Sequence, residues 1–204
     1  MYVPPEFRIA ERDRAVGLIE RHPFATLVTA ATPYPRVSLI PIVHELRDDA
    51  LWLVGHVARG NPHAASIEEC ADATVVFTGP HAYISASWYE RPYETVPTWN
   101  YVAVHICGRL QPCDAWRAVR LLSGVMERGR PDAWDPERLE PAYRQAQLRG
   151  IVAFELRAEK IYAKAKLSQN RTATDRARVL AHLAASPAAG DRACAAAMEA
   201  LVTS

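Results

Sequence analysis

No apolar run in the sequence approaches the roughly 20 residues that a membrane-spanning helix needs. The first residues, MYVPPEFRIAERDR, also lack the apolar segment of a signal peptide. Neither sign of charge dominates, because 24 Lys and Arg stand against 23 Asp and Glu, a formal net charge of +1. We therefore expect a cytoplasmic protein without membrane attachment, and the overall charge gives no argument for direct DNA binding.

Cysteine is scarce, with four residues in 204. None forms a C-x-x-C pair and no Cys/His spacing matches a zinc site, so we expect reduced thiols and no metal. The glycine-rich phosphate loops G-x-G-x-x-G and G-x-x-x-x-G-K-[ST] are absent, as are the G-x-S-x-G and H-E-x-x-H motifs. The sequence therefore disfavours a hydrolase or a metalloenzyme. Any bound nucleotide must be held by a structure other than these glycine-rich loops.

What the sequence does contain is enough apolar surface for a sizeable core, since 50% of its residues are hydrophobic. Runs of apolar and β-branched residues predict strands over residues 24–29, 36–44, 50–56, 74–77, 82–88, 98–110 and 151–162. Helical spacing predicts helices over residues 11–22, 61–70, 114–128, 137–149 and in an Ala-rich tail after 171. About six strands with few intervening helices indicate an antiparallel barrel or sandwich.

The segment GHVARGNPH is polar where a strand is expected to end and a helix to begin. Asn61 would cap that helix, whose free N–H groups favour a phosphate. His56 and Arg59 could add hydrogen bonds to the same anion. The plainer interpretation is that Asn61 is only a cap and that Arg59 is a solvated side chain.

Two further segments carry aromatic, hydroxyl, amide and basic side chains that could hold a planar ring and its phosphate: Thr98, Trp99 and Asn100, and Lys166, Ser168 and Gln169. The alternative for the aromatic residues is a place in the core or in an interface. The alternative for the second segment, which directly follows the last predicted strand, is an ordinary solvated loop.

Taken together, the blocks MYVPPEF, RHPFATLVT, GHVARGNPH, FTGPHAYISASWY, VPTWNYVAVHICG and KAKLSQNR resemble the PaiB-like family of FMN-binding negative transcriptional regulators. This family is related to the pyridoxamine-phosphate-oxidase split barrels. The resemblance implies an α+β fold that is mainly β: a six-stranded antiparallel split barrel over residues 1–171, with peripheral helices and a helical C-terminal extension over 172–204.

The same resemblance implies a homodimer that holds FMN between its subunits. By analogy, the segments around Arg59 and Lys166 would meet the phosphate, and the strand with Trp99 and Asn100 would contact the ring. The sequence names no catalytic residue.

Three functions stay open at this point. The first is a flavin-binding negative regulator of transcription, although no helix-turn-helix with a basic recognition helix is visible. The second is an FMN-dependent oxidoreductase that uses a nicotinamide or another small reductant. The third is a dimeric scaffold without flavin. It stays open because the sequence departs from the family pattern at Gly60, Ala65, Ala86 and residues 38–41.

Overall fold

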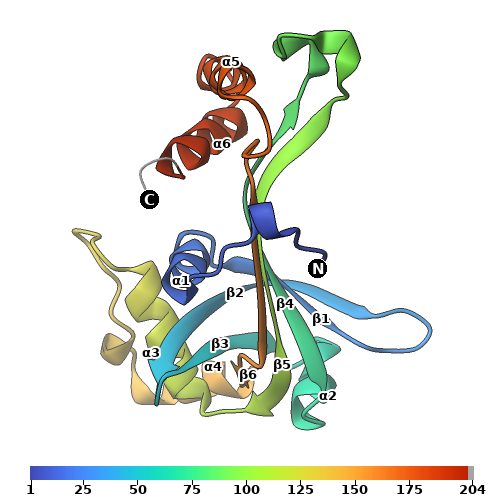
Figure 1. Cartoon of the computed structure of the whole chain (residues 1–204). Helices are drawn as coiled ribbons and strands as arrows, with labels where there is room; N and C mark the ends of the chain where they lie inside the picture. The colour runs from blue at the N-terminus through green and yellow to red at the C-terminus, as the bar shows by residue number, and fades with distance from the viewer. Residues whose placement is uncertain (202–204) are drawn as a thin grey trace. The chain divides into compact units, whose positions relative to one another are not determined.

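A computed structural model describes residues 1–201 of the chain, and its main element is one large sheet (Figure 1). The strands are β1 (Phe24–Thr29), β2 (Arg36–Arg47), β3 (Ala50–Ala58), β4 (Asp72–Ile84), β5 (Thr98–Pro112), β6 (Ile151–Arg157) and β7 (Lys160–Lys166). The helices are α1 (Arg12–Arg21), α2 (His63–Glu68), α3 (Ala115–Met126), α4 (Pro141–Arg149), α5 (Ala173–Ala184) and α6 (Ala189–Ala200). No helix within residues 1–201 is long and apolar enough to cross a membrane.

The strand order explains how the sheet closes on itself. The order is β4-β1-β2-β3-β6-β5-β7, and an additional pairing joins β4 to β5. Strands β4, β1, β2, β3, β6 and β5 therefore form a ring, and β7 extends from β5. The pairs β1–β2, β1–β4, β2–β3, β3–β6 and β5–β6 are antiparallel. This confirms the predicted fold class: mainly β with α, built on an antiparallel ring-like sheet.

The chain divides into two compact units, and several strands pass from one into the other. The first unit contains Met1–Ala15, Thr78–Val104 and the residues from Tyr162 onward; the second contains Val16–Phe77 and His105–Ile161. The predicted division at residue 171 stays a prediction, and the last three residues of that extension, 202–204, lie outside the described part of the chain.

The core of the second unit consists of the side chains on one face of its strands. Leu27, Leu53, Val75 and Phe154 are buried there, all with 1% exposure or less. Strands β5 and β6 approach so closely that a Cβ on Gly108 would lie 2.1 Å from a backbone carbonyl oxygen. A residue larger than glycine would therefore push these two strands apart.

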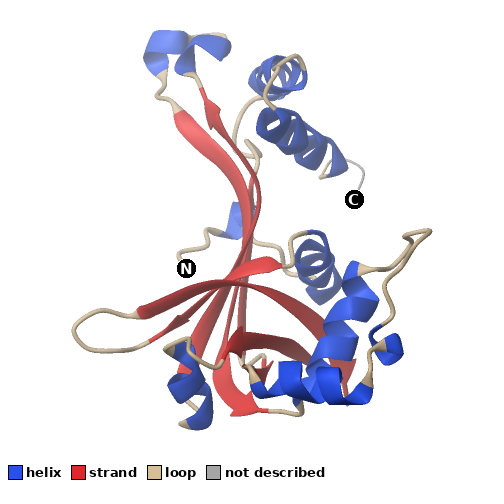
Figure 2. Cartoon of the chain, turned by 180° about the vertical axis from the view of Figure 1, so that it is seen from behind, coloured by secondary structure: helices blue, strands red, loops and turns tan. Residues whose placement is uncertain are grey.

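On the other face of the second unit's sheet, α3 packs through Ala118 and Leu122 against Val43, Val54 and Ala153. Figure 2 shows this helix lying across the strands. As the sequence predicts, Asp114 caps the helix: its carboxylate accepts a hydrogen bond of 2.6 Å from the N–H of Arg117.

The structure differs from the sequence-based prediction at several elements. The strand predicted over residues 82–88 ends with β4 at Ile84, and the helix predicted over 137–149 begins at Pro141 as α4. Residues 151–162 form two strands rather than one, because the backbone N–H groups of Ala158 and Glu159 bond to Leu51 and Cys107 instead of continuing β6. Strand β4 is continuous across Pro80. The neighbouring strand β1 pairs only with residues 73–76 of β4. The edge of β4 that faces β1 therefore needs no N–H donor at Pro80. The predicted helix 61–70 shortens to α2.

Candidate functional site

Within the first unit, the predicted residues on β5 come together with those at the end of β7 and just after it. The Lys166 ammonium donates hydrogen bonds to the hydroxyl of Thr98 and to the carbonyl oxygen of Trp99, the latter at 2.7 Å. Burial lowers the pKa of Lys166, and the charges of Lys164 and Arg171 lower it further. The ammonium therefore already has acceptors within the protein.

Asn100 and Ser168 form a buried reciprocal pair in the same unit. The side-chain NH2 of Asn100 donates to the Ser168 hydroxyl at 3.0 Å, and this hydroxyl donates to the side-chain oxygen of Asn100 at 3.2 Å. Gln169 closes its own turn: it donates to the carbonyl oxygen of Ala165 at 2.5 Å and accepts from the N–H of Leu167 at 2.6 Å. The polar groups of these predicted cofactor residues thus already have partners within the protein.

Trp99 is the member of this group that offers surface to a ligand. Its side chain is 53% exposed. Its ring meets that of Tyr83 edge-on at 6.0 Å between centroids and lies 6.3 Å from the ring of His81. Its predicted role in cofactor binding stays a prediction.

The predicted residues His56, Arg59 and Asn61 lie in the second unit and differ in their hydrogen-bond partners. Arg59 donates to the carbonyl oxygens of Arg149 at 2.8 Å and Ile151 at 3.0 Å, so its guanidinium ties β3 to the end of α4 and the start of β6. His56, on β3, has a buried Nδ1 with no hydrogen-bond partner among the described residues. Burial lowers its pKa, which favours the neutral ring.

Asn61 belongs to a group of polar side chains that the sequence patterns did not bring together, here called the polar cluster. Its members come from β1, β2 and the segment that leads into and forms α2: Thr29, Arg36, Ser38, Asn61, His63 and Ser66. Thr29 pairs with Arg36 and Leu27 with Ser38 across β1 and β2, which places the β1 and β2 members on the inward face of this hairpin with Leu27.

One half of the polar cluster is centred on Ser66. Arg36 donates to the Ser66 hydroxyl at 2.7 Å, and the Thr29 hydroxyl lies 3.2 Å from the same oxygen. Thr29 and Ser66 are buried, while Arg36 is partly accessible. The arrangement holds the guanidinium beside two hydroxyl groups.

The other half is centred on His63, which is only 1% exposed. Asn61 donates to the Ser38 hydroxyl at 3.0 Å and accepts from the backbone N–H of His63 at 2.9 Å. The Ser38 hydroxyl also lies 2.8 Å from Nδ1 of His63 and 3.4 Å from the amide oxygen of Asn61, so its hydrogen has two candidate acceptors. We assign the Ser38 hydrogen to Nδ1, the shorter of the two contacts, and therefore the ring proton to Nε2.

The Nε2 of His63 is buried and has no partner among residues 1–201. Burial lowers the pKa of His63 and the nearby Arg36 lowers it further, so the ring stays neutral and Nε2 is a donor without an acceptor. A buried donor without a partner costs about 1–3 kcal/mol. The polar cluster thus combines a guanidinium, three hydroxyls and a spare N–H, and none of its members is acidic.

A cavity of about 450 Å³ adjoins the polar cluster, since Thr29 also lines it. Cys107, on β5, and Lys160, at the start of β7, lie along its wall. This volume is in the range of small-molecule sites. The alternation of Arg36 and Ser38 on one strand face, followed by the polar segment Asn61–His63, was the available sequence signal for this site.

Solved structures with this fold include flavin-binding proteins. The chain is 20% identical to the FAD and heme binding protein from Mycobacterium smegmatis, with a TM-score of 0.59 over 78% of this chain and 73% of that one. It is 15% identical to a flavocytochrome from Azotobacter vinelandii, with a TM-score of 0.58 over 78% and 69% of the two chains. These likenesses establish the fold class.

The family is established by sequence. The family described as "Putative FMN-binding domain" matches residues 1–160. The chain is also 38% identical, over 188 residues, to "Protease synthase and sporulation protein PAI 2" of Bacillus subtilis, covering 90% of this chain and 89% of that protein. The chain belongs to this PaiB-like family, as its sequence motifs predict.

Proposed function

We propose that this protein binds FMN and holds the phosphate of the cofactor in the polar cluster. The observation that carries the proposal is the buried N–H of His63, which has no acceptor among the described residues, beside Arg36 in a group of donors without a carboxylate. A phosphate offers several acceptor oxygens and a negative charge, which is what these donors lack. The family to which the chain belongs supports the choice of FMN.

The residues present fit this group chemically. Arg36 would supply a charge-assisted hydrogen bond, and the hydroxyls of Thr29, Ser38 and Ser66 can each turn toward an oxyanion. The adjoining cavity of about 450 Å³ gives room beside the cluster, and its lining includes Lys160 together with the acidic residues Asp72 and Glu159. When bound, the flavin ring supplies redox chemistry of its own.

A phosphate-specific titration tests the proposal. Flavin fluorescence would follow binding of FMN and of riboflavin, which lacks the phosphate, to the wild type and to Arg36→Met. We expect FMN to bind roughly 10- to 100-fold more weakly to Arg36→Met, with riboflavin affinity unchanged. Equal loss of both ligands, or no loss of either, would overturn the assignment of the phosphate.

Arg59→Met is the matched comparison for this titration, because the sequence motif assigns the phosphate to Arg59. Its guanidinium is bonded to two backbone carbonyls, so we expect lower stability but an unchanged preference for FMN over riboflavin. A loss of that preference in Arg59→Met alone would place the phosphate where the sequence motif predicts it.

The homodimer is also part of the proposal. Phe24, Val37 and Leu39 lie on one face of the β1–β2 pair by register and are 64%, 59% and 64% exposed. Adjacent exposed apolar side chains on one strand face favour association, here with a second copy. Light scattering should give the mass of a dimer for the wild type and of a monomer for Leu39→Glu; a monomeric wild type would exclude the dimer.

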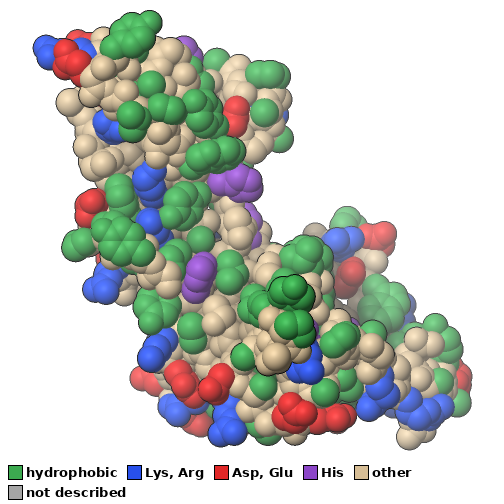
Figure 3. Space-filling model, turned by 90° about the vertical axis from the view of Figure 1, so that its right-hand side faces the viewer, with side chains coloured by type: hydrophobic (Ala, Val, Ile, Leu, Met, Phe, Trp, Pro, Cys, Tyr) green, Lys and Arg blue, Asp and Glu red, His purple; other side chains and the backbone are tan. Residues whose placement is uncertain are grey.

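A role in negative transcriptional regulation, as the family resemblance implies, is proposed to be indirect. On the face shown in Figure 3, Lys and Arg side chains are interspersed with Asp and Glu instead of forming a basic patch. A labelled-promoter assay should show no salt-sensitive shift with the protein alone. A shift that weakens steeply with salt would establish direct binding instead.

A further inference from the structure

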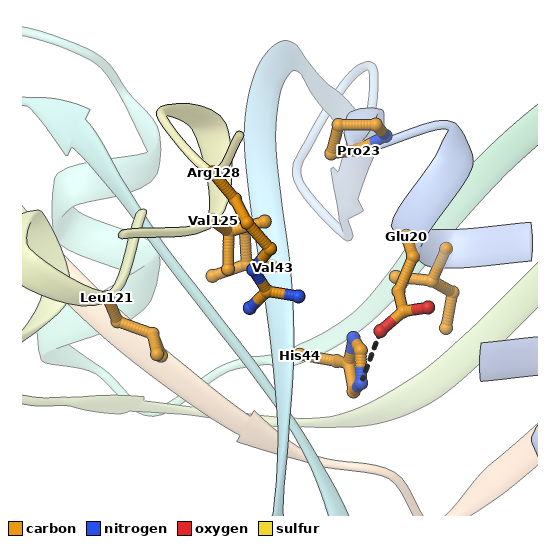
Figure 4. A pocket seen from close by; sticks show the side chains of 8 residues that line it. Glu20, Pro23, Val43, His44, Leu121, Val125 and Arg128 are labelled. Atoms are coloured by element: carbon orange, nitrogen blue, oxygen red, sulfur yellow. Dashed lines mark ion pairs between the residues drawn. The ribbon is translucent and has the colours of Figure 1, made fainter. Parts of the chain in front are cut away.

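A second cavity of the second unit, of about 380 Å³, shares no residue with the polar cluster or with the cavity beside it. It lies among α1, β2 and α3 (Figure 4). Its apolar wall includes Ile19 from α1, Val43 from β2, and Leu121 and Val125 from α3. Ile19 and Val43 are almost fully buried, so this part of the wall is a fixed portion of the core.

Three polar side chains complete the cavity: Glu20, His44 and Arg128. The Glu20 carboxylate lies 3.7 Å from Nε2 of His44, and the His44 side chain is only 17% exposed. In Figure 4 the Arg128 guanidinium lies on the opposite side of His44 from Glu20. Arg128 is solvent-exposed and lines this cavity with its guanidinium, whose charge acts on His44.

The charges of the cavity balance. Burial lowers the pKa of His44, and Arg128 lowers it further, while Glu20 opposes them; the net direction is downward, so the ring is neutral at pH 7. One negative and one positive group therefore flank a neutral ring beside an apolar wall. This pattern suits a ligand with one charge of each sign and an apolar body.

We propose that this cavity binds a small aliphatic α-amino acid. Its carboxylate would pair with Arg128, its ammonium with Glu20, and its side chain would rest on Ile19, Val43 and Val125. A plain carboxylic acid would satisfy Arg128 but bring a second carboxylate toward Glu20. A plain amine would pair with Glu20 but leave Arg128 paired with water alone and add a positive charge to the cavity. The zwitterion uses both groups.

Calorimetric titration of the full chain with three ligands that share the isobutyl side chain of leucine tests the proposal. L-Leucine carries both charges, 4-methylpentanoate lacks the ammonium, and 3-methylbutylamine lacks the carboxylate. We expect leucine to bind about tenfold or more tightly than either analogue. Equal binding of the three, or no binding of leucine at millimolar concentration, would overturn the proposal.

Two variants assign the charges. Arg128→Gln should lose most of the leucine affinity, and Glu20→Gln should remove the advantage of leucine over 4-methylpentanoate. Arg138→Gln and Glu69→Gln, which change exposed residues outside the cavity, should leave leucine binding unchanged. A loss in the control variants equal to that in Arg128→Gln and Glu20→Gln would refute the assignment. FMN binding, measured separately, should not change in any of the four variants.

Discussion

Two groups of polar side chains in this protein are alike in composition and differ in how completely they are paired. In the first unit, Asn100 and Ser168 bond to each other, and the Lys166 ammonium bonds to two oxygens of β5. In the polar cluster of the second unit, the network ends on Nε2 of His63, which has no partner among the described residues. The first group completes itself, whereas the second leaves a donor for something else.

The difference teaches how to distinguish a structural polar network from a binding site when both are rich in the same residue types. Hydrogen bonds that close within the protein stabilise the fold, because each buried group has exchanged water for a protein partner. A buried donor with no partner carries a cost that a ligand can relieve. Stability and FMN affinity, measured in the same variants, therefore separate these two roles.

The largest effect is expected from Asn100→Ala. This change leaves the buried Ser168 hydroxyl without its partner and opens a small cavity, so the free energy of unfolding should fall by about 2–3 kcal/mol. Urea denaturation of the flavin-free protein measures this loss. Asn170→Ala is the matched control, since Asn170 is exposed in the same segment. Normal stability with lost FMN binding in Asn100→Ala would reverse the comparison.

The next effect is expected in the polar cluster, where His63→Asn keeps a polar atom near the position of Nδ1 but removes Nε2. FMN should bind roughly tenfold more weakly, about 1.4 kcal/mol, while stability should stay the same or rise because an unpaired buried donor is gone. His63→Gln, whose amide reaches the position of Nε2, should recover part of the affinity. Unchanged FMN binding in His63→Asn would contradict the role of the spare N–H.

Much of the fold follows from local patterns in the sequence. The runs of apolar and β-branched residues over 24–29 and 36–44 predict β1 and β2, and Asp114 correctly marks the start of α3. The division of residues 151–162 into β6 and β7 could not be predicted in this way. It depends on backbone hydrogen bonds from residues 158 and 159 to strands far away in the sequence.

The candidate site was only partly predictable. Asn61 was identified because its neighbourhood resembles a helix start, and its side chain does accept from the N–H of His63 at the start of α2. Its second partner, Ser38 on β2, could not be predicted from local patterns. Arg59 has the chemistry of a phosphate ligand, yet backbone carbonyls of Arg149 and Ile151 accept its hydrogen bonds. Residue type thus identifies which side chains can bind an anion, while the tertiary contacts decide which of them are free to do so.

A smaller loss of stability is expected on acidification, and it should begin in the second unit. Burial lowers the pKa of five histidines, all in that unit: His22, His44, His56, His63 and His105. Below the unfolded-state value of about 6.5 the unfolded chain binds more protons than the folded one, so stability should fall as pH decreases from 7 toward 5. It should level off above pH 7.

Hydrogen exchange at pH 5.5 and 7.5 would measure this effect segment by segment. Amides of the second unit should lose protection at the lower pH before those of the first unit. His56→Gln should reduce the pH dependence of unfolding, because it removes one histidine whose pKa is lowered by burial. The change breaks no hydrogen bond at Nδ1, which has no partner among the described residues. Equal loss of protection in both units would contradict this difference between them.

The smallest effect on FMN affinity is expected from Lys166→Met, although the sequence motif assigns this lysine to the phosphate. Its ammonium already donates to Thr98 and Trp99, so FMN affinity should change by less than about twofold, while stability should fall by about 1 kcal/mol. Fluorescence titration and urea denaturation of the same preparation measure the two quantities. If FMN binding fell tenfold or more at unchanged stability, the first unit would contain a ligand site as well, and the contrast between a closed network and an open one would fail.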